Sequence, residues 1–433
     1  MARQRSVYLE DLPLAEARAR IDAALAAAGF DGPFSGEDVS LAEARGRVTA
    51  TPVWAAVSAP HYHASAMDGY AVRARDTREA SETRPVTLRL IEHEADAERV
   101  ERPMQACNTG HHLPAWADAV VMVEHVQPGA EADTFIIRSS VAPWQHVRAM
   151  GEDMVATELV LPANHTLRPV DLGALAGSGH ATAHVRRRPR AAVIPTGSEL
   201  VSAESLSEGQ RPVPGRIIEF NSLVLAGQVE EWGAEARRWA IVHDDYDAIR
   251  EAVLAAAQAH DLVLVNAGSS AGTEDYTVHV IRDLGEVVVH GVAVRPGHPV
   301  IFGMVAVEGR RVPIIGVPGY PVSAALTGEI FIEPILSRWL GRPPVEPPNL
   351  DAVISRKLVS PPGDDDYVRV TVGKVGDRVI ATPLARGAGV ISSLVRADGI
   401  LRVPRFSEGV DAGEQVTVHL YRSPAEIART AVH

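Results

Sequence analysis

The spacing of apolar positions changes along the chain and divides it into segments of different secondary structure. Residues 13–30 place apolar side chains at helical spacing, which predicts a helix. Ser40-Leu41-Ala42-Glu43 fits a capping box and predicts a second short helix. From about 54 to 148 the pattern changes to short alternating runs, such as 86–91 and 135–137, broken by proline and glycine. This pattern is typical of a small β-rich domain.

Fully apolar runs alternate with helical patterns in the middle of the chain. The runs lie at 191–194, 237–242, 261–265, 287–294 and 312–316, and the helical stretches at about 221–233, 246–259 and 276–283. Strands that are apolar throughout are buried on both faces, so this alternation predicts a mostly parallel sheet covered by helices on both sides. Ligands in such a sheet bind at the carboxyl ends of the strands.

Two short stretches indicate where the domains meet. The arginine run 186–190 directly precedes a strand in an acidic chain, so a solvated hinge is favoured over a nucleic-acid patch. The proline cluster 342–348 is a stiff linker, and residues 351–424 beyond it alternate in period two. We expect a discontinuous, helical N-terminal and linker domain (1–53 and 149–186), a β-rich insertion domain (54–148), an α/β domain (187–342) and a C-terminal all-β domain (343–433).

Composition narrows the classes of function. With 433 residues, 46% of them hydrophobic, the chain can form several cores. Its net charge of -13 opposes non-specific binding to nucleic acid or to an anionic membrane, so an anionic ligand would need a local basic pocket. Lys357 and Lys374 are the only lysines, so such a pocket would use the planar guanidinium groups of arginine, although high-GC coding gives the same bias.

The single cysteine, Cys107, excludes an intramolecular disulfide and a cysteine-based metal cluster, as expected in a reducing cytoplasm. His111 and His112 lie close enough in sequence to leave a catalytic thiol open, but no nucleophile motif surrounds Cys107. An uninterrupted apolar run of membrane length is absent, as is an N-terminal signal-type segment. We therefore expect a soluble cytoplasmic protein.

Candidate ligand-binding residues gather at glycine turns after strands. Residues 195–200 (PTGSEL) and 266–275 (NAGSSAGTED) can offer backbone N–H groups to phosphate, with Glu199 and Asp275 placed to hold a hard metal ion. A structural turn is the alternative for either segment alone, but two such turns in one sheet favour a binding site. The segment 65–72 (SAMDGYAV) fixes the carboxylate of Asp68 at a bend, and an ordinary Asp-Gly turn is again the alternative.

A third glycine turn, 316–323 (GVPGYPVS), places Ser323 in the opening turn of a helix. The proline-stiffened loop 295–299 adds Arg295 and His298 as cations that could hold a tetrahedral oxyanion. Arg369 and Ser392 in the last domain are of the right types to join them, although each could be an ordinary strand or loop residue.

These motifs, in this order, resemble the molybdopterin molybdenumtransferase family, which comprises the bacterial MoeA proteins and the E domain of gephyrin. The resemblance covers nearly the whole chain. It includes SAMDGYAV at 65–72, Thr109-Gly110, Gly151-Glu152-Asp153, PTGSEL at 195–200, Asn221, the segment 268–275, Pro296-Gly297, Pro318-Gly319, Arg369 and Gly399. It implies an α/β multidomain fold with a MogA-like α/β domain, a homodimer, and active sites shared between the α/β domain of one subunit and the insertion domain of the other.

The resemblance also implies a reaction: Mg²⁺-dependent insertion of molybdenum from molybdate into adenylylated molybdopterin, with release of AMP. Molybdate and tungstate are nearly alike in size and charge, and both suit this expectation. Implied partners are a MogA-type adenylyltransferase and apo-molybdoenzymes. By motif position, the catalytic and metal-binding residues are Asp68, Asp153, Glu199 and Asp275; the cofactor-binding residues are Thr109, Gly110, Thr196, Gly197, Gly268, Ser270, Gly272, Pro318 and Gly319; and the molybdate residues are Arg295, His298, Ser323, Arg369 and Ser392.

Four departures from the family pattern lie near the implied site. They are His111, Ala267, His298 in place of the usual lysine, and Tyr320 in place of the usual asparagine. Two alternatives therefore stay open: a non-catalytic protein that binds, carries or senses molybdenum cofactor, and a related nucleotidyl enzyme. The four acidic positions favour catalysis, because a carrier has little use for clustered carboxylates.

Overall fold

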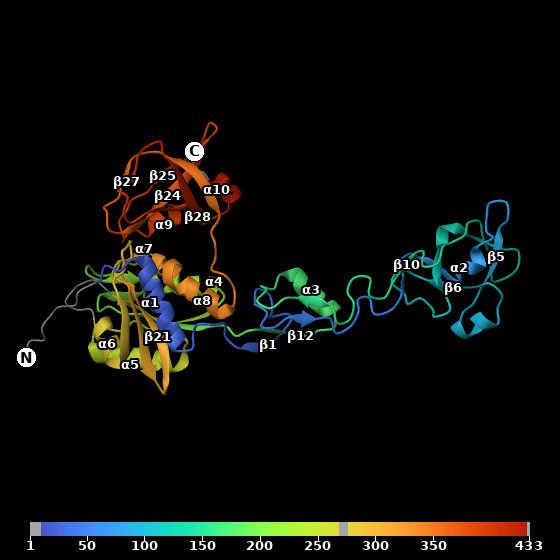
Figure 1. Ribbon diagram of the computed structural model, residues 1–433, viewed down its shortest axis with the longest axis horizontal. Coiled ribbons are helices and arrows are strands. Elements are labelled where there is room, and N and C mark those ends of the chain that lie inside the picture. Colours follow the sequence, from blue (N-terminus) through green and yellow to red (C-terminus); the bar gives the residue numbers. More distant parts are fainter. Residues whose placement is uncertain (1–9, 268–275, 431–433) are drawn as a thin grey trace, which may run out of the picture. The chain divides into compact units, whose positions relative to one another are not determined.

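The computed structural model describes residues 10–267 and 276–430 (Figure 1). The chain forms two compact units: residues 36–185, here called the inserted unit, and residues 1–35 together with 186–433, here called the split unit. Each unit has hydrophobic cores of its own.

The inserted unit contains a six-stranded sheet in the order β7-β4-β6-β5-β9-β8. All its pairings are antiparallel except that between β5 and β6. Val72, Leu88, Met104 and Ile137 point into its core and are fully buried. The strands are β4 (Gly69–Val72), β5 (Val86–Leu90), β6 (Pro103–Cys107), β7 (Ala119–Met122), β8 (Val126–Pro128) and β9 (Thr134–Ile137), and the helix α2 (Ala74–Thr77) follows β4.

A second core in the same unit lies under α3 (Pro169–Gly177) and contains Leu167, Leu175 and Val185. Short antiparallel pairs join distant segments of this unit, and β1 pairs with β12. The elements are β1 (Gly36–Ser40), β12 (Thr182–Arg186), β2 (Val53–Trp54), β11 (Leu159–Leu161), β3 (Ala64–Ser65) and β10 (Val147–Arg148).

The helix predicted at Ser40–Glu43 is wrong. Ser40 ends β1, and its Oγ donates a hydrogen bond to the Glu43 carboxylate at 2.7 Å, whereas in a capping box each side chain accepts from the backbone N–H of the other residue. The chain then makes a single turn, because Gly46 takes a left-handed conformation (φ 76°) that ends any helix. The motif thus brings Ser40 and Glu43 together, but through a side-chain contact in a turn and not at the start of a helix.

The α/β part of the split unit has the strand order β16-β13-β17-β21-β20-β18. β13, β16, β17 and β21 are parallel to one another, and β20 and β18 are antiparallel to their neighbours. The strands are β13 (Arg190–Pro195), β16 (Glu235–Arg238), β17 (Leu262–Ala267), β18 (Gly285–His290), β20 (Ile301–Val307) and β21 (Arg310–Pro318). The shorter β14 (Leu200–Ser202) and β15 (Ile217–Glu219) pair beside it.

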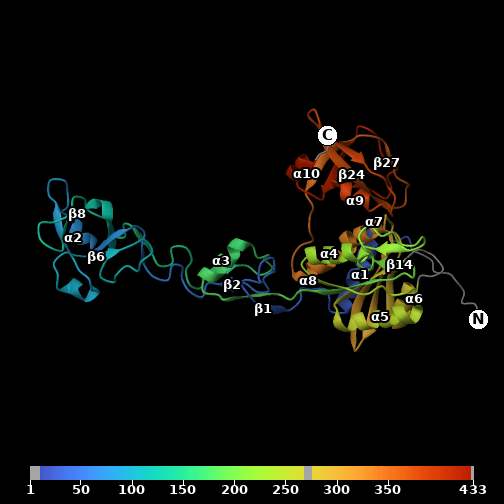
Figure 2. The same ribbon diagram turned by 180° about the vertical axis from the view of Figure 1, so that it is seen from behind.

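Helices cover both faces of this sheet, as the sequence predicted. Ala191 and Val193 belong to one core with α1, α4, α7 and α8, whereas Ala192 and Ile194 belong to the other core with α5 and α6. Alternate residues of one strand thus face opposite helical layers. Figure 2 shows the helices of the two layers, with α4 and α8 apart from α5 and α6. The helices are α1 (Leu14–Ala27), α4 (Asn221–Glu231), α5 (Tyr246–Ala259), α6 (Thr277–Leu284), α7 (Pro321–Thr327) and α8 (Glu333–Leu340), with a π-helical turn at Gly328–Ile332 between the last two.

The C-terminal part is all-β, as expected. Its strands pair in the order β24-β25-β22-β28-β26, and β26 pairs back with β24, which closes the sheet and leaves no free edge. β19 (Val294–Arg295) adds to β24 in parallel, so the α/β part and the barrel share a sheet. The barrel strands are β22 (Asn349–Ile354), β24 (Asp365–Val375), β25 (Arg378–Pro383), β26 (Gly399–Val403) and β28 (Gln415–Leu420), accompanied by a β23 (Leu358–Val359) and β27 (Gly409–Val410) pair and by the helices α9 (Ser392–Arg396) and α10 (Pro424–Thr430).

Candidate active site

The three segments predicted as glycine turns begin at the ends of three adjacent parallel strands, although residues 268–275 of the second lie outside the described residues. Pro195 at the end of β13 is in register with Asn266 of β17, and Ala267 of β17 is in register with Pro318 of β21. The strands therefore end side by side, and the turns that follow them start from one edge of the sheet. This edge is where ligands bind in open α/β sheets.

The first turn is fixed by hydrogen bonds. The Gly197 N–H donates to the Val242 carbonyl at 3.0 Å, and Ser198 and Asp244 exchange two bonds of 3.1 Å between backbone N–H groups and side-chain oxygens. Glu199, next in the turn, is exposed. A Cβ on Gly197 would lie 2.9 Å from a Glu199 carboxylate oxygen, so the glycine leaves room for that carboxylate. Asp244 joins this edge and was missed by the sequence analysis.

The other strand ends are tied together by side-chain amides. Asn266 Nδ2 donates to the Pro318 carbonyl at 3.1 Å, and Asn221 Nδ2 donates to the Gly319 carbonyl at 2.7 Å. Within the described residues, Thr196 Oγ1 and Asn221 Oδ1 are buried without a hydrogen-bond partner. Few buried polar atoms in folded proteins lack a hydrogen-bond partner, so each one calls for an explanation. A polar ligand that binds at this edge would supply the missing partners. Gly268, Ser270, Gly272 and Asp275 lie outside the described residues.

A basic cavity of about 470 Å³ lies between the α/β part and the barrel of the split unit. Arg295 and Arg369, both predicted as molybdate residues, line it together. Arg386 lines it as well, and it was not identified from the sequence, because it lies in a loop with no motif around it. The remaining lining residues are Pro296, Val359, Pro361, Asp366 and Tyr367.

Arg369 is the unusual member of this cavity because it is a buried cation, 2% exposed. Its guanidinium donates to the carbonyls of Ala385 at 2.8 Å and Gly387 at 3.3 Å, and to Ser393 Oγ at 3.2 Å. In the part of the chain that the structure describes, it forms no ion pair. Burial lowers the pKa of Arg369 from its usual value, as expected for a cation held by neutral groups.

The other two arginines of the cavity are paired. Arg295 contacts the Asp364 carboxylate at 2.8 Å, and Arg386 pairs with Asp366, which also accepts a hydrogen bond from Ser360. The cavity thus holds three guanidinium groups, and only that of Arg369 has no carboxylate among its hydrogen-bond acceptors.

The remaining predicted oxyanion residues do not line this cavity. Ser323 is buried in the first turn of α7, with its carbonyl 3.9 Å from the Cβ position of Gly297. Ser392 is half-buried at the start of α9, and its neighbour Ser393 is the serine that contacts Arg369. His298 faces carboxylates instead, with Nδ1 3.5 Å from Asp11 and 3.9 Å from Asp364.

In the inserted unit, two predicted residues meet. Asp68 Oδ1 accepts hydrogen bonds from the Thr109 N–H at 2.7 Å and from Thr109 Oγ1 at 2.9 Å. These bonds, and more weakly the nearby His111, lower the pKa of Asp68 from its usual value, so the exposed carboxylate stays ionised. The Gly110 N–H donates to the Ser65 carbonyl at 2.8 Å and holds the two loops together.

The glycine of this motif is required by packing. A Cβ on Gly69 would lie 2.0 Å from the Val121 carbonyl, so only glycine lets β4 approach β7 this closely. Asp153 lies in an exposed loop of the same unit, and its N–H donates to the Ala59 carbonyl at 3.0 Å. Cys107 is buried, and burial raises the pKa of its thiol, which argues against a catalytic thiolate.

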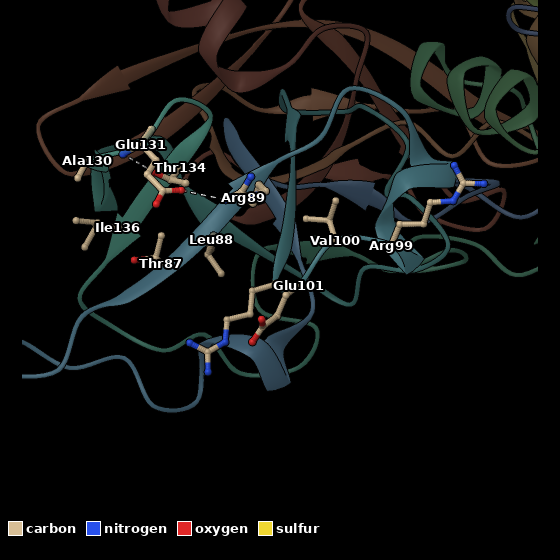
Figure 3. A pocket seen from close by; sticks show the side chains of 11 residues that line it. Thr87, Leu88, Arg89, Arg99, Val100, Glu101, Ala130, Glu131, Thr134 and Ile136 are labelled. Carbon is tan, nitrogen blue, oxygen red and sulfur yellow. Dashed lines mark hydrogen bonds and ion pairs between the residues drawn. The ribbon is translucent and has the colours of Figure 1, made fainter.

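A larger cavity, about 660 Å³, lies on the β sheet of the inserted unit. Arg89 pairs with Glu131 at 3.2 Å across it, whereas the guanidinium of Arg99 points away from that pair (Figure 3). Its charged groups do not converge on a point, so this cavity is a weaker candidate than the basic cavity despite its larger volume.

Among the described residues, no helix has the length and apolar character needed to cross a membrane.

Three regions known from one family match the chain in order. The MoeA N-terminal region (domain I and II) matches residues 12–179, the probable molybdopterin binding domain matches 192–338, and the MoeA C-terminal region (domain IV) matches 351–421. The chain belongs to the MoeA family. The MogA-like α/β domain, the β-rich part and the C-terminal β domain expected from the sequence are confirmed by this match and by the structure.

Individual relatives align with this chain over most of their length. A molybdopterin molybdenumtransferase 2 of Mycobacterium tuberculosis is 35% identical over 385 residues, which cover 84% of this chain and 90% of that protein. A molybdopterin biosynthesis protein of Methanocaldococcus jannaschii is 34% identical over 378 residues, 86% of this chain and 89% of that protein. Among solved structures, a MoeA protein of Pyrococcus horikoshii has a TM-score of 0.78 at 29% identity and covers 96% of this chain and 100% of its own.

Proposed function

We propose that this protein inserts molybdenum from molybdate into adenylylated molybdopterin and releases AMP, which makes it a molybdopterin molybdenumtransferase of the cytoplasm. Its relatives in Mycobacterium tuberculosis, Nostoc and Bacillus subtilis carry that name. The observation that carries the proposal furthest is the basic cavity, in which Arg369 is buried and has no carboxylate partner among the residues that the structure describes.

The charge of Arg369 explains why the cavity suits an oxyanion. An unpaired buried cation costs several kcal/mol in an apolar environment, on the order of the penalty measured when one partner of a buried pair is removed. A molybdate dianion in the cavity would supply the missing partner, and charge-assisted hydrogen bonds to guanidinium groups are among the strongest in proteins. Arg295 and Arg386 border the same space and would add donors.

The edge of the sheet suits the other substrate. Glycine turns at strand ends commonly offer backbone N–H groups to phosphate oxygens, and the turn after Pro318 would do so here. The Thr196 and Gly197 N–H groups donate to the Asn266 and Val242 carbonyls, both at 3.0 Å, so the first turn would contribute side chains instead. Thr196 Oγ1 and Asn221 Oδ1 remain available there as polar contacts, within the part of the chain that is described. The oxyanion cavity and the nucleotide edge would then bring the two reactants together in the orientation that transfer requires.

Magnesium fits the donor types at the predicted positions. Glu199 and Asp153 offer exposed carboxylate oxygens, and Asp68 is held ionised by Thr109, which are the hard ligands that Mg²⁺ prefers. We propose that these residues, with Asp275 and with Asp244 beside Ser198, hold Mg²⁺ against the phosphates. When bound, the ion would neutralise charge that develops as the phosphoanhydride bond breaks.

We also propose a homodimer with shared active sites, because the predicted residues are divided between the inserted unit and the split unit. Mixing two inactive variants tests this idea. Subunits carrying Asp68→Asn and subunits carrying Asp275→Asn should regain activity when they form mixed dimers. Mixed dimers without activity, or a monomer in analytical ultracentrifugation, would contradict it. A MogA-type adenylyltransferase and apo-molybdoenzymes are the protein partners that this reaction calls for.

The central test is turnover. Purified protein is incubated with adenylylated molybdopterin, Mg²⁺ and molybdate, and AMP is measured with and without molybdate. We expect molybdate-dependent AMP release in the wild type and its loss in Asp153→Asn. Tight binding of the pterin substrate without AMP release would show that the protein is a carrier or sensor of the cofactor instead.

A further inference from the structure

We propose that Asp11, His298 and Asp364 form a binding site for a divalent transition-metal ion such as Zn²⁺, separate from the magnesium site and beside the oxyanion cavity. One ligand atom from each side chain lies within 4.8 Å of the other two, and in the part of the chain that the structure describes this is the one such group. The proposal goes beyond the proposed reaction and does not depend on it.

Backbone pairing brings these three residues together from distant parts of the sequence. Leu12 forms a β-bridge with Val292, and the Ala293 N–H donates to the Leu12 carbonyl at 2.8 Å, which places Asp11 beside the loop that carries His298. β19 pairs with β24, with Val294 opposite Asp365, and this pairing fixes Asp364 beside the same loop. The ligands are therefore held by backbone geometry from three segments.

The distances suit a shared ion better than direct hydrogen bonds. His298 Nδ1 lies 3.5 Å from Asp11 Oδ1 and 3.9 Å from Asp364 Oδ1, whereas a hydrogen bond between such groups measures about 2.7–3.2 Å. Ligands bound at about 2.0–2.2 Å from one Zn²⁺ ion are separated by about 3–4 Å. A metal ion can therefore take a central position without a large movement of the side chains.

Charge and ligand type indicate the kind of ion. The two carboxylates carry more negative charge than the single guanidinium of Arg295, which contacts Asp364 through its other oxygen. Imidazole is a good ligand for zinc and related ions and a poor one for magnesium, which prefers oxygen. The side chain of Asp364 is 15% exposed and that of Asp11 71% exposed, so one side of the site is open to water that would complete the coordination.

The residue at position 298 decides whether the site can exist. A lysine at this position would place its own ammonium beside Asp11 and Asp364 and leave no room for a metal cation. Histidine supplies a neutral nitrogen ligand instead. At this position the chain therefore carries a metal ligand, beside the residues that line the oxyanion cavity.

The test is calorimetric titration of Zn²⁺ into the full-length protein at pH 7.5 in a buffer that does not bind metals. Wild type should bind one more Zn²⁺ per chain than His298→Lys. Asp364→Asn should lower the affinity for this Zn²⁺ by about tenfold or more, because even the loss of a residue that supports a metal ligand costs about 10–100-fold in affinity. His93→Gln, which removes an exposed histidine in the other unit, should bind like the wild type. Mg²⁺ should not compete for this site.

Two results would overturn the proposal. One is equal Zn²⁺ stoichiometry and affinity in wild type and His298→Lys. The other is loss of the additional Zn²⁺ in His93→Gln while His298→Lys still binds it. Circular dichroism of each variant confirms that it is folded. Because the readout is metal binding, it is independent of AMP release, so failure of this site and failure of the proposed enzyme are distinguishable.

Discussion

Asp68 and Thr109, which lie in separate motifs of the sequence, form a two-point contact in which both the N–H and the hydroxyl of Thr109 donate to Asp68 Oδ1. The contact leaves the other carboxylate oxygen, Oδ2, without a hydrogen-bond partner in the described residues. A carboxylate fixed in this way is positioned before a metal ion or substrate arrives, which reduces the entropy that binding would cost.

Substitutions at this contact should distinguish the effect of the Asp68 charge on AMP release from the effect of how Thr109 positions the carboxylate. Asp68→Asn removes the charge and should lower molybdate-dependent AMP release by about tenfold or more, because a proposed metal ligand is lost. Thr109→Val keeps the shape but removes one of the two donors, and should lower the rate by about threefold to tenfold, as for one ordinary hydrogen bond of about 0.5–1.5 kcal/mol. Steady-state AMP assays with both variants check this. Wild-type turnover in Asp68→Asn would remove Asp68 from the catalytic residues.

A second prediction concerns Arg369. Arg369→Lys keeps a positive charge but loses the planar group that bonds two carbonyls and Ser393, so molybdate affinity should fall by about tenfold or more. Arg378→Gln removes an exposed arginine from β25 of the same barrel and serves as the control. Equilibrium dialysis with radioactive molybdate measures both. Equal molybdate binding by Arg369→Lys, Arg378→Gln and the wild type would show that the cavity does not hold the oxyanion.

A third prediction concerns the stability of the inserted unit. The Asp171 carboxylate, with its side chain 5% exposed, accepts bonds from Arg168 through Nε at 3.1 Å and the terminal nitrogen at 2.9 Å, and from His165 at 2.8 Å. These contacts hold the pKa of Asp171 well below its usual range. A lowered carboxylate pKa stabilises the fold above the unfolded value and loses this effect as the pH falls toward the folded value.

Asp171→Asn should therefore destabilise the protein at pH 7 by about 1–3 kcal/mol, the usual range for a charged hydrogen-bonded group. The loss should shrink as the pH falls below about 4, because the carboxylate of the unfolded chain becomes protonated there while that of the folded chain is still ionised. Differential scanning calorimetry of the full chain, with its separate transitions compared between pH 7 and pH 3, measures this. A constant difference between variant and wild type across that range would contradict the assignment.

The regular helices and buried strands could be predicted from the sequence because local patterns determine them. α5 spans Tyr246–Ala259 as predicted, and the Asp245 carboxylate caps it by accepting from the Ala248 N–H at 2.9 Å. Strand β20 was missed, and its pairing with β21 depends on the turn at Glu308-Gly309, whose residues have φ of 48° and 81°. The run 287–294 was predicted as one strand, but the chain turns at Gly291, where a Cβ would lie 2.3 Å from the Glu10 carbonyl.

The candidate site was predictable only where a motif carries it. Arg295 and Arg369 were predicted together from family motifs, and the structure brings both to one cavity. Asp68 and Thr109 were predicted for different roles, and the structure joins them by two hydrogen bonds. Asp244 and Arg386 have no motif, and the carboxylates that face His298 come from segments far from it in sequence. Such contacts depend on tertiary pairing between strands, which no local pattern encodes.

A fourth prediction follows from Glu329, which lies in the π-helical turn between α7 and α8 and contacts Tyr421. Burial, opposed by the hydrogen bond with Tyr421 and supported by the nearby Glu231, raises the pKa of Glu329 to about 7. Burial and the Glu329 carboxylate also raise the pKa of Tyr421, so the tyrosine stays neutral. Tyr367 is another neutral group in this surrounding, because burial raises its pKa.

The sign of the effect follows from proton uptake. Glu329 in the unfolded chain loses its proton near pH 4.5, but in the folded chain near pH 7, so folding takes up a proton between these values and the free energy of unfolding falls as the pH rises. Glu329→Gln stays neutral at every pH and avoids that loss. Relative to the wild type, the variant should gain stability from pH 5 to pH 8, by at most about 3 kcal/mol. Urea unfolding at pH 5 and pH 8 measures the gain, with Glu346→Gln in the exposed linker as control. A difference between Glu329→Gln and wild type that is the same at both pH values would show that Glu329 is ionised in the folded protein across this range.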